Sequence, residues 1–280
     1  MNIKEILDEI EIYDGKYKHK EITAALQQKE EIIPHLIAIL EKVRDAPEKY
    51  IDYSDYYAHV YALMLLGHWR EVKAHQVIID LVSLPDPLPT DLFGDIITED
   101  LDIILLRTCG GSLDKIKELV TNKNADEYSR GAAITAIAYA VIDNLITRED
   151  ALSFLGGLFV EEQVDEDPTF YSQVACAIYD LYPEELMDTI KDAYDRDLID
   201  RFFIGIADFQ EALNDGKEKR LAQLRENFSD HSLDDIHKSM QGWACFSRGS
   251  DKPSVPKQPA FQSWNSPDPK PKKKKAFWDL

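Results

Sequence analysis

The sequence predicts an all-α fold, a HEAT- or armadillo-like helical-repeat solenoid followed by a disordered C-terminal tail. No segment alternates polar and apolar residues for long enough to predict a strand. Apolar residues recur instead at helical spacing, in pairs of stripes separated by short breaks. The pairs begin near Ser54, Asp91, Asp126 and Pro168, and the separations of 37, 35 and 42 residues match the period of such repeats.

The stretch from Tyr56 to Leu84 gives the clearest pair. Because Gly67, His68 and Trp69 separate its two stripes by so short a break, we expect two helices that fold back on each other. A single pair of this kind cannot bury both faces, so it needs similar neighbours. The two stripes consist of Ala58, Tyr61, Ala62, Leu65 and Leu66, then Ala74, Val77, Ile78, Leu81 and Val82.

Local signals place the other helices. Residues 1–50 read as three helices, the third starting near Pro34 and ending at Pro47. After the proline-rich loop 85–89, one helix is expected from about Asp91 through Leu105, and Ser112 is expected to cap the next.

The second half repeats the scheme. A helix is expected to open at Asp126 with a stripe of small residues, and Thr147 with Asp150 predicts the capped start of its partner. Pro168 and Pro183 suit helix starts, and a last pair is expected over 200–228. The predicted organisation is a helical-repeat domain at 1–228, a terminal segment at 229–250 and a tail at 251–280.

Composition separates the tail from the body. The full chain carries a formal charge of -20, which opposes binding of the repeat body to nucleic acid or anionic membranes. The three widely spaced cysteines imply no disulfide framework, and uncharged runs such as 131–142 are too short for a membrane span. With no signal-peptide pattern at the start, a cytoplasmic location is expected.

No motif predicts catalytic, metal-binding or cofactor-binding residues, so no cofactor is expected. The seven histidines are scattered, and the chain lacks HExxH, GxSxG, P-loop and GxGxxG patterns. The acids Glu99, Asp100 and Asp102 cluster at a predicted helix start, where the macrodipole favours negative charge. An unrecognised hydrolase remains an alternative because the absence of a motif does not exclude chemistry.

A candidate interaction surface comes from aromatic residues off the buried stripe. Tyr53, Tyr57 and Trp69 fall outside it, and such residues are enriched at recognition hot spots. Together with Glu99 and Asp100 they predict a non-enzymatic scaffold that binds a basic protein or peptide. Ordinary packing between repeats is the competing interpretation, and the oligomeric state stays open. Arg130, at a helix start, is expected to pair with Asp126, Glu127 or an acid of the preceding repeat.

The tail carries a second candidate motif. Residues 251–280 hold six of the thirteen prolines, and seven lysines against three acids. Its cluster could dock in a groove between repeats, or it could be a mere solubilising extension. The cluster consists of Lys272, Lys273, Lys274, Lys275, Phe277 and Trp278.

Several segments resemble a bacterial family known as domain of unknown function 1186. They are YALMLLGHWREVKAHQVIIDLVSLP, LFGDIITEDL, ADEYSRGAAITAIAYAV and TREDALSFL. The resemblance implies a HEAT-like fold over roughly residues 1–215 and no known activity. Some relatives end in a zinc-binding SEC-C motif, but here only Cys245 lies in that region, so that site is absent. A nucleic-acid- or translation-associated role, suggested by other HEAT-like and SEC-C proteins, is the alternative function.

Overall fold

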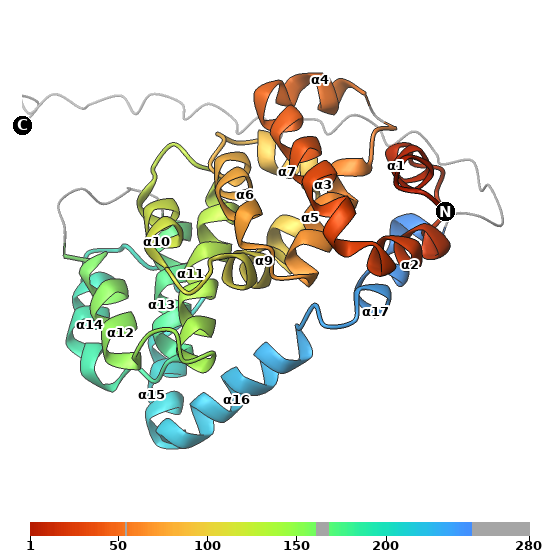
Figure 1. Cartoon of the computed structure of the whole chain (residues 1–280). Helices are drawn as coiled ribbons and strands as arrows, with labels where there is room; N and C mark the ends of the chain where they lie inside the picture. Colours follow the sequence, from red (N-terminus) through yellow and green to blue (C-terminus); the bar gives the residue numbers. More distant parts are fainter. Residues whose placement is uncertain (54, 161–167, 248–280) are drawn as a thin grey trace, which may run out of the picture.

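A computed structural model describes residues 1–53, 55–160 and 168–247 of the chain. Within these residues the fold is all-α, with helices α1 to α17 and three short 3-10 helices (Figure 1). The described part holds no strand, only an isolated bridge between Ile12 and Tyr56. The all-α helical-repeat prediction is therefore confirmed. The predicted tail and its Lys272–Trp278 motif lie outside the described residues.

The first helices are α1 (Ile3–Glu11), α2 (His19–Gln27), α3 (Lys29–Asp45) and α4 (Pro47–Asp52). Asn2 and Glu5 form a capping box at the start of α1. Pro34 lies inside α3 rather than at its start, and Pro47 begins α4. The predicted start near Pro34 was therefore late by more than one turn, whereas the predicted end at Pro47 agrees closely with the end of α3 at Asp45.

Helix α5 (Ala58–His68) lies at the centre of the N-terminal half, and every residue from Ala58 to Gly67 is buried. The predicted break at Gly67 was wrong. Gly67 lies within α5, and a Cβ there would lie 2.9 Å from Cγ1 of Ile104. The glycine therefore permits close packing of α5 against the helix that carries Ile104. The chain turns three residues later at Arg70, where φ is 56°, and continues through η1 (Val72–Ala74) into α6 (His75–Val82).

The single helix predicted from Asp91 is three short helices, α7 (Leu88–Phe93), α8 (Ile96–Glu99) and α9 (Leu101–Thr108). Gly94, with φ of 56°, ends α7 because this left-handed conformation cannot continue a helix. Helix α10 (Asp114–Thr121) follows. Its N-cap position is Leu113, so the expected Ser112 cap was wrong by one residue; Ser112 Oγ still accepts the Asp114 N–H at 3.3 Å.

Helix α11 (Glu127–Ile142) contacts α9, α10, α13 and α16 and organises the C-terminal half. Asp126 caps it as expected, and Thr147 caps α12 (Arg148–Gly157). Residues 200–205 precede the last pair instead of belonging to it. The remaining helices are α13 (Pro168–Asp180), η2 (Glu184–Leu186), α14 (Met187–Asp195), α15 (Ile206–Asp215), α16 (Lys217–Asp230), α17 (Ile236–Gln241) and η3 (Ala244–Ser247).

Buried arginines join neighbouring helices by capping their C-terminal ends. Arg107 Nε donates to the Gly67 carbonyl at 2.9 Å, Arg130 Nε to Val120 at 3.0 Å, and Arg148 Nε to Leu181 at 2.6 Å. Each guanidinium donates to a carbonyl at or just beyond the C-terminal end of a neighbouring helix and complements the negative end of its macrodipole. Arg130 also lies over the ring of Phe170, with its Cζ 3.9 Å from the ring centroid.

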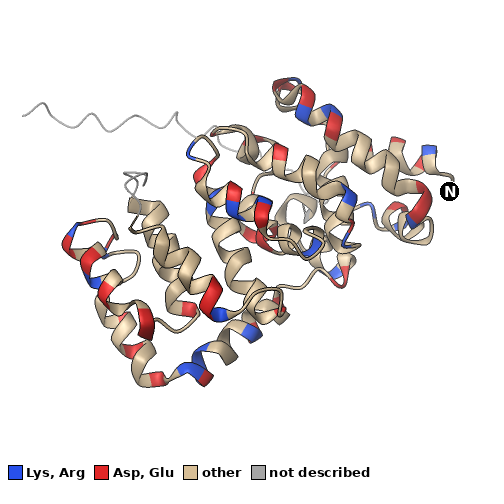
Figure 2. Cartoon of the chain, turned by 60° about the vertical axis from the view of Figure 1, so that its left-hand side comes forward, with Lys and Arg blue, Asp and Glu red and all other residues tan. Residues whose placement is uncertain are grey.

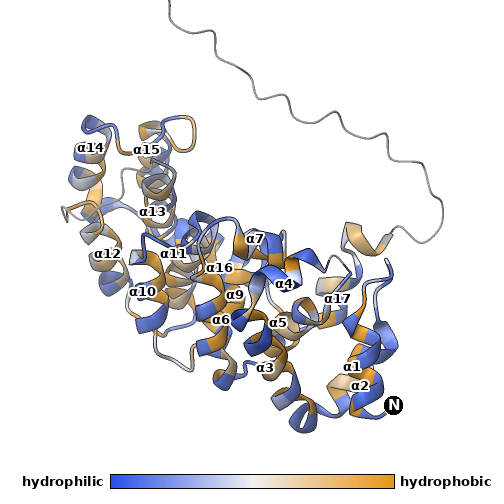
Figure 3. Ribbon diagram, turned by 90° about the horizontal axis from the view of Figure 1, so that it is seen from above, coloured by the Kyte–Doolittle hydropathy of each residue, from blue (hydrophilic) through white to orange (hydrophobic). Residues whose placement is uncertain are grey.

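The last helices return to the first. Helix α16 runs back across the molecule, and α17 contacts α2 and α5 (Figure 1). Seen from above, α4 and α7 lie next to each other and are in contact (Figure 3). The contacts of α17 with α2 and α5 join distant parts of the chain. Segments more than 200 residues apart in sequence are thereby brought together. No helix in the described ranges is long and apolar enough to cross a membrane.

Candidate binding groove

A groove of about 650 Å³ opens where α4, the start of α5, α7, α8 and residues 242–245 meet. It combines tyrosines on one side with carboxylates on the other. We call it the tyrosine–acid groove. Its lining residues include Tyr50, Tyr53, Tyr56, Tyr57, His59, Asp91, Phe93, Asp95, Glu99, Asp100, Gly242, Trp243, Ala244 and Cys245.

The aromatic side is a contiguous set of rings. The Tyr50 and Tyr56 centroids lie 4.8 Å apart, those of Tyr53 and Tyr56 6.4 Å apart, and Tyr56 stacks on His59 at 5.5 Å with an interplanar angle of 6°. Lys49 Nζ lies 5.3 Å from the Tyr50 centroid, so this cluster already holds one ammonium group over a ring. The rings offer electron-rich faces to a further cation.

His59 connects the aromatic side to α7. Its Nε2 donates to the Leu92 carbonyl at 2.6 Å, since a carbonyl oxygen can only accept. Burial lowers the His59 pKa to about 4, although the bond to Leu92 opposes the shift. The ring is therefore neutral at pH 7 and adds no positive charge that would repel a cationic ligand.

The acidic side comes from Asp91, Asp95, Glu99 and Asp100. In the described ranges no lysine or arginine forms an ion pair with any of these four carboxylates. Figure 2 shows acidic residues distributed over helices along the whole described chain. In this hollow, four acids without a lysine or arginine partner in the described ranges line the same groove as the exposed Tyr53 and the partly buried Tyr50, Tyr56 and Tyr57.

Asp100 is the least exposed of the four acids and occupies the turn between α8 and α9. Burial raises its pKa to about 6. His231 opposes this shift, while the nearby charges of Asp102 and Glu99 add to it. His231, which lies 3.5 Å from Asp102, is a nearby basic group, but in the described ranges Asp100 has no lysine or arginine partner, so an incoming cation would favour its charged form.

Residues 242–245 form the remaining wall. Next to them, Phe246 packs among four tyrosines and stacks on Trp243 at 5.8 Å and on Tyr61 at 6.2 Å. The Tyr13 hydroxyl donates to the Cys245 carbonyl. This aromatic contact fixes the position of the wall relative to α1 and α5. The four tyrosines are Tyr13, Tyr17, Tyr57 and Tyr61.

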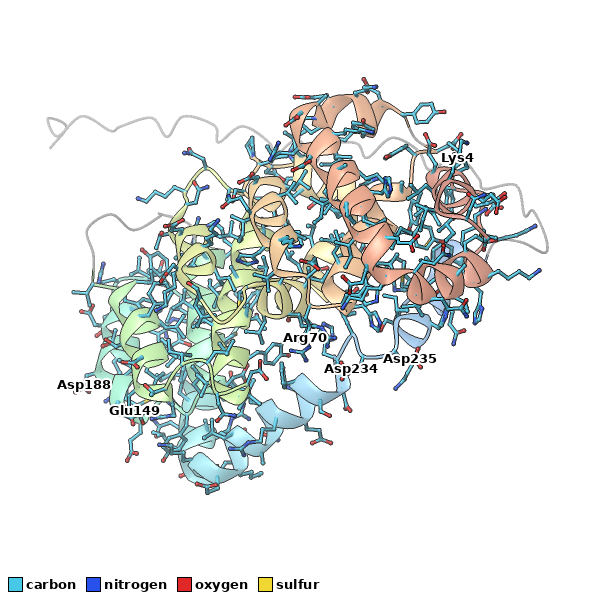
Figure 4. The ribbon with its side chains drawn as sticks, viewed as in Figure 1. Lys4, Arg70, Glu149, Asp188, Asp234 and Asp235 are labelled. Atoms are coloured by element: carbon cyan, nitrogen blue, oxygen red, sulfur yellow. The ribbon has the colours of Figure 1, made fainter. Side chains whose placement is uncertain are left out.

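Residues 231–247, which we call the return segment, are held by polar contacts as well. His68 Nδ1 donates to the Leu233 carbonyl at 2.7 Å, and Arg107 Nη1 bonds Asp234 at 2.7 Å. Figure 4 shows Asp234 beside Arg70 near the end of α16, and Arg70 also helps to lower the Asp234 pKa after Arg107. His237 stacks on His19 at 4.1 Å. The groove is therefore assembled from residues 50–60 and 90–100, together with residues 242–245 near the end of the described chain.

The structure places four of the five predicted surface residues along this groove: Tyr53, Tyr57, Glu99 and Asp100. Trp69 lies beyond the end of α5, outside the groove. Sequence analysis missed Asp91 and Asp95, which lie on α7 and at the N-cap of α8, on either side of the unpredicted turn at Gly94. It also missed Trp243 and Cys245, for which no local signal exists.

A second hollow of about 470 Å³ lies between α11, α13 and α16. Its acid Asp180 is already paired with Arg220 at 2.8 Å, and Asp102 lies 3.5 Å from His231. In the described part of the chain, no group of three or more histidine, cysteine or acidic residues is arranged to hold a metal ion. Of these two hollows, the tyrosine–acid groove is therefore the one whose carboxylates have no lysine or arginine partner in the described ranges.

Comparisons with known proteins agree with the sequence resemblance. The family model described as "Protein of unknown function (DUF1186)" matches residues 1–247. An uncharacterised protein of Chlamydia muridarum (strain MoPn / Nigg) is 32% identical over 245 residues, which are 87% of this chain and 97% of that protein. One from Chlamydia trachomatis serovar D is 31% identical over 245 residues, 87% of this chain and 96% of its own length. No solved structure matches.

Proposed function

Since the chain belongs to the DUF1186 family, whose function is unknown, we propose from its own groove that it is a non-enzymatic scaffold that binds a basic segment of a protein partner. The observation that carries the proposal is the unpaired set of Asp91, Asp95, Glu99 and Asp100 beside stacked tyrosines. A cytoplasmic location belongs to the same proposal.

The chemistry of the groove favours guanidinium and ammonium groups. A cation there gains attraction from the four acids and contact with the tyrosine faces. The neutral His59 does not oppose it. Nucleic acid is disfavoured because the same carboxylates repel phosphate.

The test is a titration of the full chain with fluorescein-labelled octa-arginine, followed by anisotropy at 50 mM and 300 mM salt. A triple variant, D95N/E99Q/D100N, removes three groove charges. Its control, E211Q/E218Q/E226Q, removes three exposed charges from α15 and α16. We expect the groove variant to bind at least tenfold more weakly than the control.

Equal affinity of the two variants would show that only overall charge attracts the probe. Tighter binding of a single-stranded oligonucleotide than of octa-arginine would favour the nucleic-acid alternative. We expect octa-arginine binding to weaken with salt, because the screening length between exposed charges falls from about 14 Å at 50 mM to about 6 Å at 300 mM.

A further inference from the structure

We propose, on the basis of the function proposed above, that the chain's own segment Lys270–Leu280 occupies the tyrosine–acid groove until a basic partner displaces it. The groove and the segment are complementary in charge and in aromatic content. The protein would thus carry a competitor for its own binding site.

The end of the described chain lies at the groove itself. Gly242 to Cys245 form its wall, and the described residues stop at 247, where the family match also ends. The 22 residues from 248 to 269 separate this point from Lys270. At up to roughly 3.3 Å per residue this length spans about 70 Å, which is ample for a return to the adjacent groove.

The charges match in sign and density. The segment carries five lysines, Lys270 and Lys272 to Lys275, with no acid until Asp279. The groove presents four carboxylates that have no lysine or arginine partner in the described ranges. Linkage in one chain raises the local concentration of the segment to the order of millimolar, so even weak pairs are populated.

The aromatic residues give the segment a second means of contact. Phe277 and Trp278 directly follow the lysines. Tyr53, 55% exposed, and the half-buried Tyr50 and Tyr56 offer ring faces at the groove. Phe246 shows the same chemistry within the described chain, because its ring is packed against four tyrosines next to the groove wall.

The experiment compares full-length variants in the octa-arginine titration. The tail variant is K272Q/K273Q/K274Q/K275Q with F277A/W278A. The control, K20Q/K73Q/K123Q/K217Q, removes the same number of positive charges from exposed positions outside the groove. We expect the tail variant to bind octa-arginine at least fivefold more tightly than the control. A synthetic peptide of residues 266–280 should compete with octa-arginine for the tail variant.

The outcomes separate the two proposals. Equal affinities of the tail variant and its control overturn the competitor proposal, while weaker binding by D95N/E99Q/D100N still supports the groove. Loss of octa-arginine binding in every chain, including the tail variant, overturns the proposed function and the competitor with it. The tail variant can also be combined with D95N/E99Q/D100N. If the tail variant binds octa-arginine more tightly and the added substitutions do not reduce that binding, the tail acts at another site, and the inference is overturned.

Discussion

Asp100 is the residue at which stability and the proposed function oppose each other. Its pKa of about 6 in the folded chain lies above the value of about 3.9 for an unfolded aspartate. The folded state therefore binds more protons between these values, and stability falls as pH rises through that window. Perturbed carboxylates of this kind cluster at functional sites.

We expect D100N to stabilise the protein at pH 7 by on the order of 2 kcal/mol and to weaken octa-arginine binding severalfold. The gain should shrink towards pH 4, where the native carboxylate is protonated; His231, Asp102 and Glu99 are the charged groups that contribute to the shift. Urea unfolding at pH 4.5 and 7.5 measures the first effect. Lower stability at pH 7 would show that the Asp100 charge supports the fold.

Gly67 gives a second prediction at the residue scale. G67A should destabilise the fold by about 1–3 kcal/mol, because the added Cβ would lie 2.9 Å from Ile104 Cγ1 and 3.3 Å from Leu233 Cδ1. G157A is the matched control, since nothing lies within 4 Å of a Cβ there, and it should be neutral or stabilising. Equal melting temperatures of the two variants would refute this packing argument.

At the scale of elements, local signals predicted most helices. The Asp126 and Thr147 caps and Pro168 mark helix starts that the structure contains. The break at Gly94 was missed because the stripe through Ile96 and Leu101 fits one helix as well as two short ones. Half of the groove followed from off-stripe tyrosines and clustered acids. The other half depends on contacts across more than 180 residues, which periodicity does not encode.

Arg148 shows how one residue joins elements. It donates to the carbonyls of Leu181 and Tyr182 and pairs with Glu185 at 2.6 Å. R148M should cost about 3 kcal/mol, and R148K should recover little because an ammonium lacks the planar fork. R225M, which changes an exposed arginine on α16, is the control, and unfolding in guanidinium chloride measures both variants. A loss below about 1 kcal/mol for R148M would argue against helix capping by arginine.

His237 makes attachment of the return segment depend on pH. Thr23 Oγ1 donates to the His19 carbonyl at 2.8 Å, so it accepts from His237 Nε2 at 3.2 Å, and Tyr17 donates to His237 Nδ1 at 2.8 Å. Burial lowers the His237 pKa, His19 and His68 add to this shift, and Asp235 opposes it. Because the unfolded pKa is about 6.5, the attachment weakens as pH falls below that value.

We therefore expect the ratio of the amide-exchange rate in α17 to that in α9 to rise when the pH is lowered from 7 to 5. The variant H237Q should make this ratio less dependent on pH, whereas H35Q, at an exposed histidine on α3, should leave it unchanged. A ratio that stays constant with pH in the native chain would rule out control by His237.

At the scale of the whole molecule, the central claim is that a basic segment binds the tyrosine–acid groove, where residues 50–60 and 90–100 meet residues 242–245. Its most direct test is photo-crosslinking of the full chain to an octa-arginine peptide with a central benzoylphenylalanine, followed by mass spectrometry of the linked fragments. The account predicts crosslinks mainly within residues 47–60, 88–100 and 242–245, and their loss in D95N/E99Q/D100N. Crosslinks mainly on α12, α14 or α15 that persist in this variant would contradict it.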